Sequence, residues 1–441
     1  MKSVSPASYT PTLSQSVARH AYSLLLVLLV WPVMLIRLLV SRFRSQAAYA
    51  RLRQRLGMTS ADVPQEGGYL FHCVSVGEVV AASVVIKALQ ARPNAPPITI
   101  STTTATGAER VRAIFGDSVS HCYLPYDFPL LIGSWLKRQS PKAVVITEVE
   151  LWPNLIHACW AQSRPVVVIN ARMTDKSARS YRKIPALFTP MLHKLTHVCA
   201  QGERDHRNYL SLGLPAHNLT LTNNIKFDQV AALTNDNHAG FLNLARGDRP
   251  VIIGGSTHEP EEDALLDMLE ALLPDHPNLL LVLVPRHPER FAVVQRLIEQ
   301  RSLPFISTSA NSHIDASCNL VLVDEMGRLN QAYQVATIAF VGGSLADRGG
   351  HNALEPAAVS VPVIMGPNTY NNPVICEYLA QQGALYLAED AKQVTAQCGD
   401  WLRNPDAARL AGEAGRAVLE ANRGALSKTL DVLSMVRAQS Q

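Results

Sequence analysis

Short apolar runs separated by amphipathic stretches recur along most of this chain, and this alternation constrains the fold more than any other feature. Five such runs follow Gly67, and the stretches between them have the apolar spacing of helices. The runs are residues 69–74, 98–102, 143–147, 165–169 and 197–200. Strands that alternate with helices predict a parallel sheet covered by helices on both faces.

The pattern starts again after a polar stretch, residues 234–249. The second series of apolar runs is 251–253, 279–284, 320–323, 337–341 and 361–364, and residues 405–436 have helical character throughout. A chain of 441 residues, 47% of them hydrophobic, is long enough for two cores. We therefore expect two doubly wound α/β domains with a ligand cleft between them.

The N-terminal region has a different composition. Residues 1–18 are polar and are expected to be disordered, whereas residues 21–36 are uncharged and almost wholly apolar. A spanning helix needs about 20 apolar residues, which this segment reaches if Arg37 extends to the membrane surface. Five arginines follow within residues 42–55, which predicts a single N-terminal anchor with the rest of the chain in the cytoplasm. Pro32 leaves open whether the anchor spans the bilayer or lies in one leaflet.

These observations divide the chain into five segments. They are a disordered extension (1–18), a membrane anchor with a basic juxtamembrane helix (19–58), a first Rossmann-like domain (59–235), a second Rossmann-like domain (236–425) and a C-terminal helix (426–441).

Composition argues against several functions. The net charge is only +4, which offers no general argument for nucleic-acid binding. The seven cysteines are scattered without a CxxC pair, as in reduced cytoplasmic proteins, and no spacing typical of a metal site occurs. A GxGxxG fingerprint is also missing, which argues against an NAD-linked reductase.

Ligands of open α/β sheets bind beyond the carboxyl ends of the strands, so the residues at these positions are the candidates for a site. In the first domain, Glu78 follows the first strand at the start of a helix. It could act as a general base, although acidic residues are common at helix starts for electrostatic reasons. Glu148 and Glu150 follow the 143–147 strand, and we expect one to face the ligand and the other to cap the next helix. Lys226 could neutralise a phosphate or carboxylate, or be an ordinary surface lysine.

Glycine-bearing strand ends gather in the second domain. Residues 254–259 (Gly-Gly-Ser-Thr-His-Glu) suit a phosphate, and Arg286 could bind one bidentately. Residues 348–356 (Arg-Gly-Gly-His-Asn-Ala-Leu-Glu-Pro) follow the strand 337–341 and Gly342-Gly343-Ser344. Their glycines would allow backbone N–H groups to approach a ligand, and Glu355, in the first turn of a helix over 352–359, could bind a ribose diol. Together these strand ends predict a nucleotide pocket.

In this order, the motifs resemble those of the 3-deoxy-D-manno-octulosonic acid (Kdo) transferase family. The resemblance is carried over residues 22–430 by the stretches His72–Glu78, Tyr123–Asp127, Glu148–Asn154, Asn170–Arg172, Ser256–Glu259, Val284–Phe291, Phe340–Leu345, Gly349–Asn352 and Gly366–Pro367. It implies a GT-B glycosyltransferase with two facing Rossmann-like domains at the cytoplasmic face of the inner membrane. The donor would be CMP-Kdo and the acceptor a tetraacylated lipid A precursor, with inversion and without a cofactor or metal.

The resemblance also implies roles for individual residues. Glu78 matches the family's general base, and Glu148 and Lys226 match positions that stabilise the transition state. The positions that match the contacts to CMP are Pro285, Arg286, Met326, Gly327, Arg328, Asn352, Ala353, Leu354 and Glu355. The sequence departs from the family pattern at Asn224, at Arg328, where Glu is frequent, and at Ala353, where Pro is frequent.

Two other functions fit parts of the pattern. Another GT-B transferase or epimerase that uses a UDP-sugar would share the two-domain architecture, and competition by CMP and UMP would separate it from a Kdo transferase. A membrane-tethered nucleotide-binding protein without catalysis would not need Glu78, Glu148 and Lys226 together.

Overall fold

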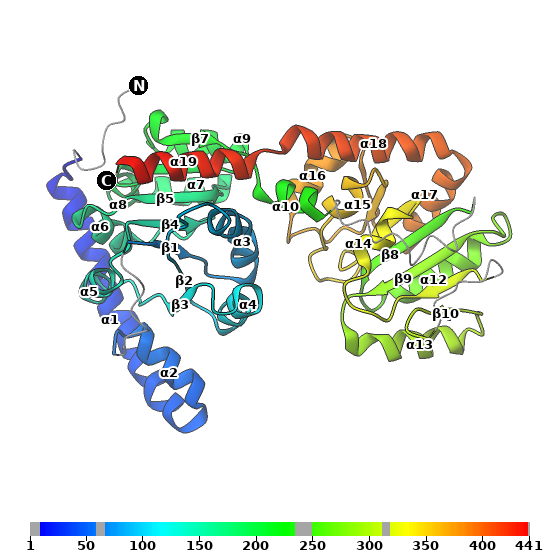
Figure 1. The fold of residues 1–441 in the computed structure, drawn as a ribbon, viewed down its shortest axis with the longest axis horizontal. Helices are drawn as coiled ribbons and strands as arrows, with labels where there is room; N and C mark the ends of the chain where they lie inside the picture. Colours follow the sequence, from blue (N-terminus) through cyan, green and yellow to red (C-terminus); the bar gives the residue numbers. More distant parts are fainter. Residues whose placement is uncertain (1–8, 59–66, 234–248, 311–317, 440–441) are drawn as a thin grey trace. The chain divides into compact units, whose positions relative to one another are not determined.

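The structure is a computed structural model that describes residues 9–58, 67–233, 249–310 and 318–439, and its residues form two compact units (Figure 1). The first unit consists of residues 1–228 and 423–441, and the second of residues 229–422. The C-terminal helix therefore belongs to the first unit, although it follows the second in the sequence.

A seven-stranded parallel sheet forms the centre of the first unit, in the order β3-β2-β1-β4-β5-β6-β7. The chain leaves β1 for β2 on one side and returns to β4 on the other, so β1 and β4 are neighbours at the topological switch point. The strands are β1 (Tyr69–His72), β2 (Ile98–Thr102), β3 (Ser120–Tyr123), β4 (Ala143–Thr147), β5 (Val166–Ala171), β6 (His197–Ala200) and β7 (Leu219–Leu221).

Alternate residues of these strands enter two separate cores, because successive side chains of a strand point to opposite faces. Tyr69 and Phe71 face one core, and Leu70 faces the other. The first core is covered by α3 (Val76–Gln90), α4 (Ala105–Phe115) and α19 (Ala425–Gln439), and α10 (Ile225–Leu233) contributes Ile225. The second is covered by α5 (Pro129–Gln139), α6 (Pro153–Ala161), α7 (Asp175–Arg182), α8 (Pro185–His193) and α9 (Glu203–Ser211). Asp228 ties α10 to α19 by accepting the N–H groups of Gly424 and Leu426 at 2.8 and 2.6 Å.

The N-terminal helix α1 (Leu13–Arg44) packs along the first unit against α6 and α8, and then against α2 (Gln46–Arg55) (Figure 1). It begins within the segment expected to be disordered, so that prediction is wrong for residues 13–18, and residues 1–8 lie outside the described residues. The cause is a capping box in which Thr12 and Gln15 bond each other's backbone N–H groups. Pro32 lies inside α1 without ending it.

The second unit has a seven-stranded sheet of the same kind, in the order β10-β11-β9-β8-β12-β13-β14, and all its strand pairs are parallel. Its switch point lies between β8 and β12. The strands are β8 (Val251–Thr257), β9 (Leu280–Pro285), β10 (Ile306–Ser307), β11 (Leu320–Leu322), β12 (Ile338–Val341), β13 (Val363–Met365) and β14 (Leu385–Leu387). The helices are α12 (Glu261–Leu272), α13 (Phe291–Gln300), α14 (Leu329–Gln334), α15 (Leu354–Ala358), α16 (Pro373–Gln381), α17 (Ala391–Arg403) and α18 (Pro405–Asn422).

The expected strands are all present, and the structure adds four that the alternation did not predict. These four, β3, β7, β10 and β14, are the outer strands of the two sheets. They are two to four residues long and only partly buried, so they lack the continuous apolar run of a central strand. The expected C-terminal helical stretch is two helices, because Gly424 adopts a φ of 93° between α18 and α19.

Candidate active site

Glu78 lies at the start of α3, directly beyond the end of β1. Ser75 caps this helix, and the Glu78 carboxylate turns back to accept the Val74 N–H at 2.7 Å and the Ser75 hydroxyl at 3.1 Å. Only 7% of the residue is exposed. Burial, together with the charges of Glu148 and Glu150, raises the pKa of Glu78 to about 8, against the opposing effect of its two hydrogen bonds. A carboxylate in this environment is a stronger base than one in water.

Glu148 lies beside Glu78 at the switch point of the first sheet. His72 at the end of β1 pairs with Ile146 of β4, and two residues later the chain leaves β4 with a φ of 60° at Glu148. The Glu148 N–H donates to the Ile169 carbonyl at 3.0 Å, which fixes its backbone against β5. Its charge also contributes to the raised pKa of Glu78, so the structure brings these two predicted residues together.

One of Glu148 and Glu150 was expected to cap the following helix, but Glu150 does not. Its carboxylate accepts the indole N–H of Trp152 at 2.9 Å, and burial raises its pKa. The cap of α6 comes from Asp127, whose two oxygens accept the N–H groups of Asn154 and Leu155 at 3.0 and 2.8 Å. Asp127 lies in another loop, so a local pattern could not reveal it.

Lys226 occupies the first turn of α10 and is half-buried. The preceding Ile225 N–H donates to the side chain of Asn170 in β5 at 3.1 Å, which holds the start of α10 at the carboxyl end of the sheet. Asn170 directly follows Ile169, the residue that binds Glu148. The start of α10, with Lys226, therefore lies at the same edge of the first unit as the two glutamates.

The second unit contains a pocket of about 420 Å³ at the carboxyl ends of its strands. Seven of the nine residues predicted to contact CMP line it: Pro285, Arg286, Met326, Gly327, Arg328, Asn352 and Glu355. The other two, Ala353 and Leu354, are buried beneath it and are 1% and 0% exposed. Glu355 lies in the first turn of α15, as predicted, although this helix has only five residues, and it accepts the Asn352 amide at 3.2 Å. Burial raises its pKa, and the Arg286 charge opposes that shift.

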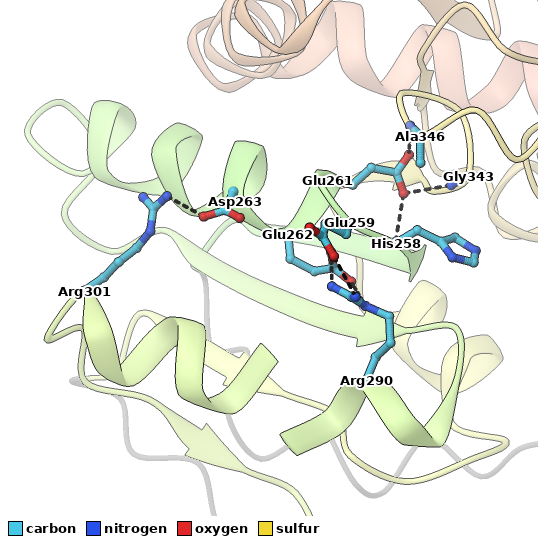
Figure 2. A network of polar contacts seen from close by, with 9 residues as sticks. All are labelled: His258, Glu259, Glu261, Glu262, Asp263, Arg290, Arg301, Gly343 and Ala346. Carbon is cyan, nitrogen blue, oxygen red and sulfur yellow. Dashed lines mark hydrogen bonds and ion pairs between the residues drawn. The ribbon is translucent and has the colours of Figure 1, made fainter. Parts of the chain in front are cut away.

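Contacts within the protein occupy the glycines at the ends of β8 and β12, and their expected role in binding a ligand stays a prediction. Gly254 and Gly255 lie inside β8, where a Cβ atom would come within 2.5 Å of Leu265 and 2.1 Å of Tyr333. The loop after β12 instead wraps around Glu261 of α12 (Figure 2). This buried carboxylate accepts five backbone N–H groups at 2.8–3.2 Å, those of His258, Gly343, Ser344, Leu345 and Ala346.

Our sequence analysis did not single out Glu261. Its bond to the backbone N–H of His258 is local, but Glu261 is the first residue of α12 and the N-cap is Pro260, so the two residues do not form the capping box that a sequence pattern could reveal. The long-range part, which joins α12 to the loop after β12, has no counterpart in local sequence.

The expectation of a metal-free site stays a prediction. Within the described ranges, no group of three or more His, Cys, Asp or Glu side chains has the geometry to hold a metal ion.

Comparison with known proteins agrees with the fold and defines the family. A family model described as 3-deoxy-D-manno-octulosonic-acid transferase (kdotransferase) matches residues 50–229. A 3-deoxy-D-manno-octulosonic acid transferase from Haemophilus influenzae is 40% identical over 92% of this chain and 96% of its own. One from Bordetella pertussis is 33% identical over 85% and 88%.

Solved structures share the architecture at low sequence identity. UDP-GlcNAc 2-epimerase from Neisseria meningitidis matches with a TM-score of 0.56 and 16% identity, over 84% of this chain and all of that one. MurG from Acinetobacter baumannii matches with a TM-score of 0.54 and 12% identity, over 83% and 99%. The two Rossmann-like units thus have the GT-B fold of glycosyltransferases. Within that class, the chain belongs to the 3-deoxy-D-manno-octulosonic acid transferase family.

Proposed function

We propose that this protein transfers Kdo from CMP-Kdo to a tetraacylated lipid A precursor, with inversion at the anomeric carbon. Membership of the family supports the sugar, and the buried Glu78 at the switch point of the first sheet is the observation that supports the mechanism. The pocket in the second unit has a carboxylate for a ribose diol and a cationic side chain for phosphate, as a nucleotide donor requires.

In the proposed reaction, the Glu78 carboxylate removes the proton from a sugar hydroxyl of the acceptor. The hydroxyl oxygen forms a bond to the anomeric carbon as the bond from that carbon to the phosphate oxygen breaks, and CMP leaves with the electron pair. A transition state with oxocarbenium character leaves negative charge growing on the phosphate. Lys226 and Arg286 are the cations that we assign to that charge.

The substrate and the product can be tested together by mass spectrometry. Purified tetraacyl lipid A precursor is incubated with the protein while CMP-Kdo is generated in place, and a mass gain of one or more Kdo residues is expected. Glu78→Gln should abolish the gain, whereas Glu109→Gln, on the exposed surface of α4, should not. No gain with the unaltered enzyme would refute the proposed acceptor or donor, and the configuration of the new linkage, read by NMR, tests inversion.

The identity of the nucleotide and the absence of a metal can be tested separately. We expect CMP to compete with the donor far better than UMP, and the reverse result would favour a UDP-sugar enzyme. We also expect full activity after treatment with a chelator, and loss of activity that Mg²⁺ or Zn²⁺ restores would refute the metal-free mechanism.

We also propose that α1 holds the enzyme at the inner membrane by lying in the plane of one leaflet. The helix has the length and hydropathy of a membrane span, but it packs against the first unit along one side. Arg19 and Ser23 both donate to the buried side chain of Asn154, and the Trp31 ring packs edge-on to Phe128. A spanning helix could not keep these contacts without drawing α6 into the bilayer.

The opposite side of α1 suits acyl chains. Its side chains form an exposed apolar face, which comprises Leu24, Leu25, Leu28, Leu29, Ile36, Leu39 and Val40. The basic residues of α2 follow directly and are suited to anionic headgroups.

Cysteine labelling would distinguish the two orientations, because all seven native cysteines are buried. Ser14→Cys and Arg42→Cys place thiols near the two ends of α1, at exposed positions. In sealed inner-membrane vesicles, an impermeant thiol reagent should label both from the same side if the helix lies in-plane. Labelling from opposite sides would show that the helix spans the bilayer.

A further inference from the structure

Two histidines meet at the switch point of the second sheet, where ligands of doubly wound folds bind. His258 follows β8 and His351 follows β12, and their Nε2 atoms lie 2.9 Å apart. The rings lie end to end in nearly the same plane, with centroids 5.2 Å apart and planes 10° from parallel. A hydrogen bond between two Nε2 atoms requires one ring to carry its hydrogen on Nε2 and the other to leave Nε2 bare.

The protein holds this pair rigidly. Glu261 accepts the backbone N–H of His258 and those of residues 343–346, so one carboxylate fixes both strand-end loops (Figure 2). Gly343, with a φ of 71°, passes so close that a Cβ atom would lie 3.0 Å from the His351 ring. His351 lines the nucleotide pocket, and His258 is hydrogen-bonded to it through Nε2.

The charges that face the pair are cationic. They are Arg286 from the loop after β9, Arg290 from the short 3-10 helix that follows it and Arg348 from the loop after β12, and the His287 ring also faces the pair. Arg290 is balanced by Glu262 at 3.1 Å and Glu259 at 3.4 Å, whereas Arg286 and Arg348 are exposed. Burial and these charges lower the pKa values of His258 and His351 to about 4, so both rings are neutral at pH 7.

An anion in this part of the pocket has to bind side chains, because Glu261 already occupies the N–H groups of residues 343–346. Negative charge beside the pair would reverse its electrostatic environment and favour a bound proton. The acceptor site for that proton is the Nδ1 of whichever ring donates from Nε2, since this nitrogen carries no hydrogen in the neutral pair.

We propose that the His258–His351 pair is the subsite for the anionic end of the donor and takes up one proton from solvent when that end binds. The inference rests on the proposed donor, in which the sugar carboxylate and the phosphoester are attached to the same carbon. Either anion has the required chemistry. His351 contacts the donor, and His258 acts through it as a positioning residue.

Calorimetry in two buffers of different ionisation enthalpy measures the protons taken up on binding. At pH 7, we expect about one proton to be bound with a CMP-Kdo analogue whose sugar–phosphate bond cannot break, and none with cytidine. The methyl ester of CMP, a phosphodiester that lacks the Kdo sugar, distinguishes the phosphate from the sugar carboxylate. Uptake with this ester assigns the subsite to the phosphate, and uptake with the full analogue alone assigns it to the carboxylate.

Matched variants separate this role from a structural one. His258→Gln should abolish the proton uptake and weaken the analogue at least about tenfold, the scale of one charged hydrogen bond, while cytidine binds as before. His287→Gln, whose ring is exposed and only touches His258 edge-on, should keep the uptake. Tight binding of the analogue without proton uptake in the unaltered protein would overturn this inference but not the proposed identity of the donor. Binding of cytidine but not of the analogue would refute the donor and the inference together.

Discussion

Replacing Glu261 by Gln tests whether one buried carboxylate organises the donor-binding unit. Three of the five bound N–H groups, those of residues 344–346, point to Oε1, and the N–H groups of His258 and Gly343 point to Oε2. A glutamine can place its oxygen at Oε1, but its amide NH₂ group then confronts the other two donors. Each buried N–H left without an acceptor costs about 1–3 kcal/mol, so the substitution should cost about 2–6 kcal/mol.

The matched control is Glu270→Gln on the same helix. The Glu270 side chain is 46% exposed and lies 3.8 Å from Arg301, so we expect a change below about 0.5 kcal/mol. Scanning calorimetry with and without CMP would identify the transition of the second unit, since ligand binding raises it. At roughly 2–4 °C per kcal/mol for a unit of this size, Glu261→Gln should lower that transition by about 4 °C or more. A midpoint equal to that of Glu270→Gln would refute the reasoning.

Four further predictions concern the first unit. If Glu78 is the base, kcat/KM should rise about tenfold per pH unit below the Glu78 pKa of about 8 and level off above it. A flat profile of kcat/KM from pH 6 to 9 would argue against this role. Because this folded-state pKa is raised above the unfolded value, the stability that Glu78 contributes is present below about pH 4 and is lost as the pH rises through about 8. Glu78→Gln should therefore melt above the unaltered protein at pH 9 but not at pH 4, and equal melting at both would contradict the buried environment. Asp127→Ala removes the cap of α6 and the acceptor of the Tyr22 hydroxyl. We expect it to lower the free energy of unfolding by about 2–4 kcal/mol and to allow protease cleavage near residue 45. Asp117→Ala, in an exposed turn, should change neither the stability nor the cleavage. Leu28→Glu, on the exposed face of α1, should reduce the fraction of protein that floats with anionic liposomes several-fold. Leu410→Glu, at an equally exposed position, should leave that fraction unchanged. The same result for both variants would exclude α1 as the membrane contact.

Much of the fold could be predicted because buried parallel strands need continuous apolar runs. The central strands of both sheets carry this signal, as in β4 and β12, and their order along the chain implies the alternation with helices. The outer strands do not carry it, since water or loops cover part of their surface. The helical start at Leu13 depended on two polar residues, Thr12 and Gln15, within a segment whose composition suggested disorder.

The candidate site could likewise be predicted from the sequence only in part. Residues at strand ends could be located from the sequence, because the direction of a parallel sheet brings their side chains to one edge, and Glu78, Glu148 and Glu355 follow this rule. Contacts between distant segments could not be located, and these decided the chemistry of the site. Only the tertiary structure shows that the glycine loop after β12 surrounds Glu261, that Asp127 caps α6, and that His258 and His351 share a hydrogen. Local sequence specifies which residues can bond, but burial and the pairing of strands determine which of them meet.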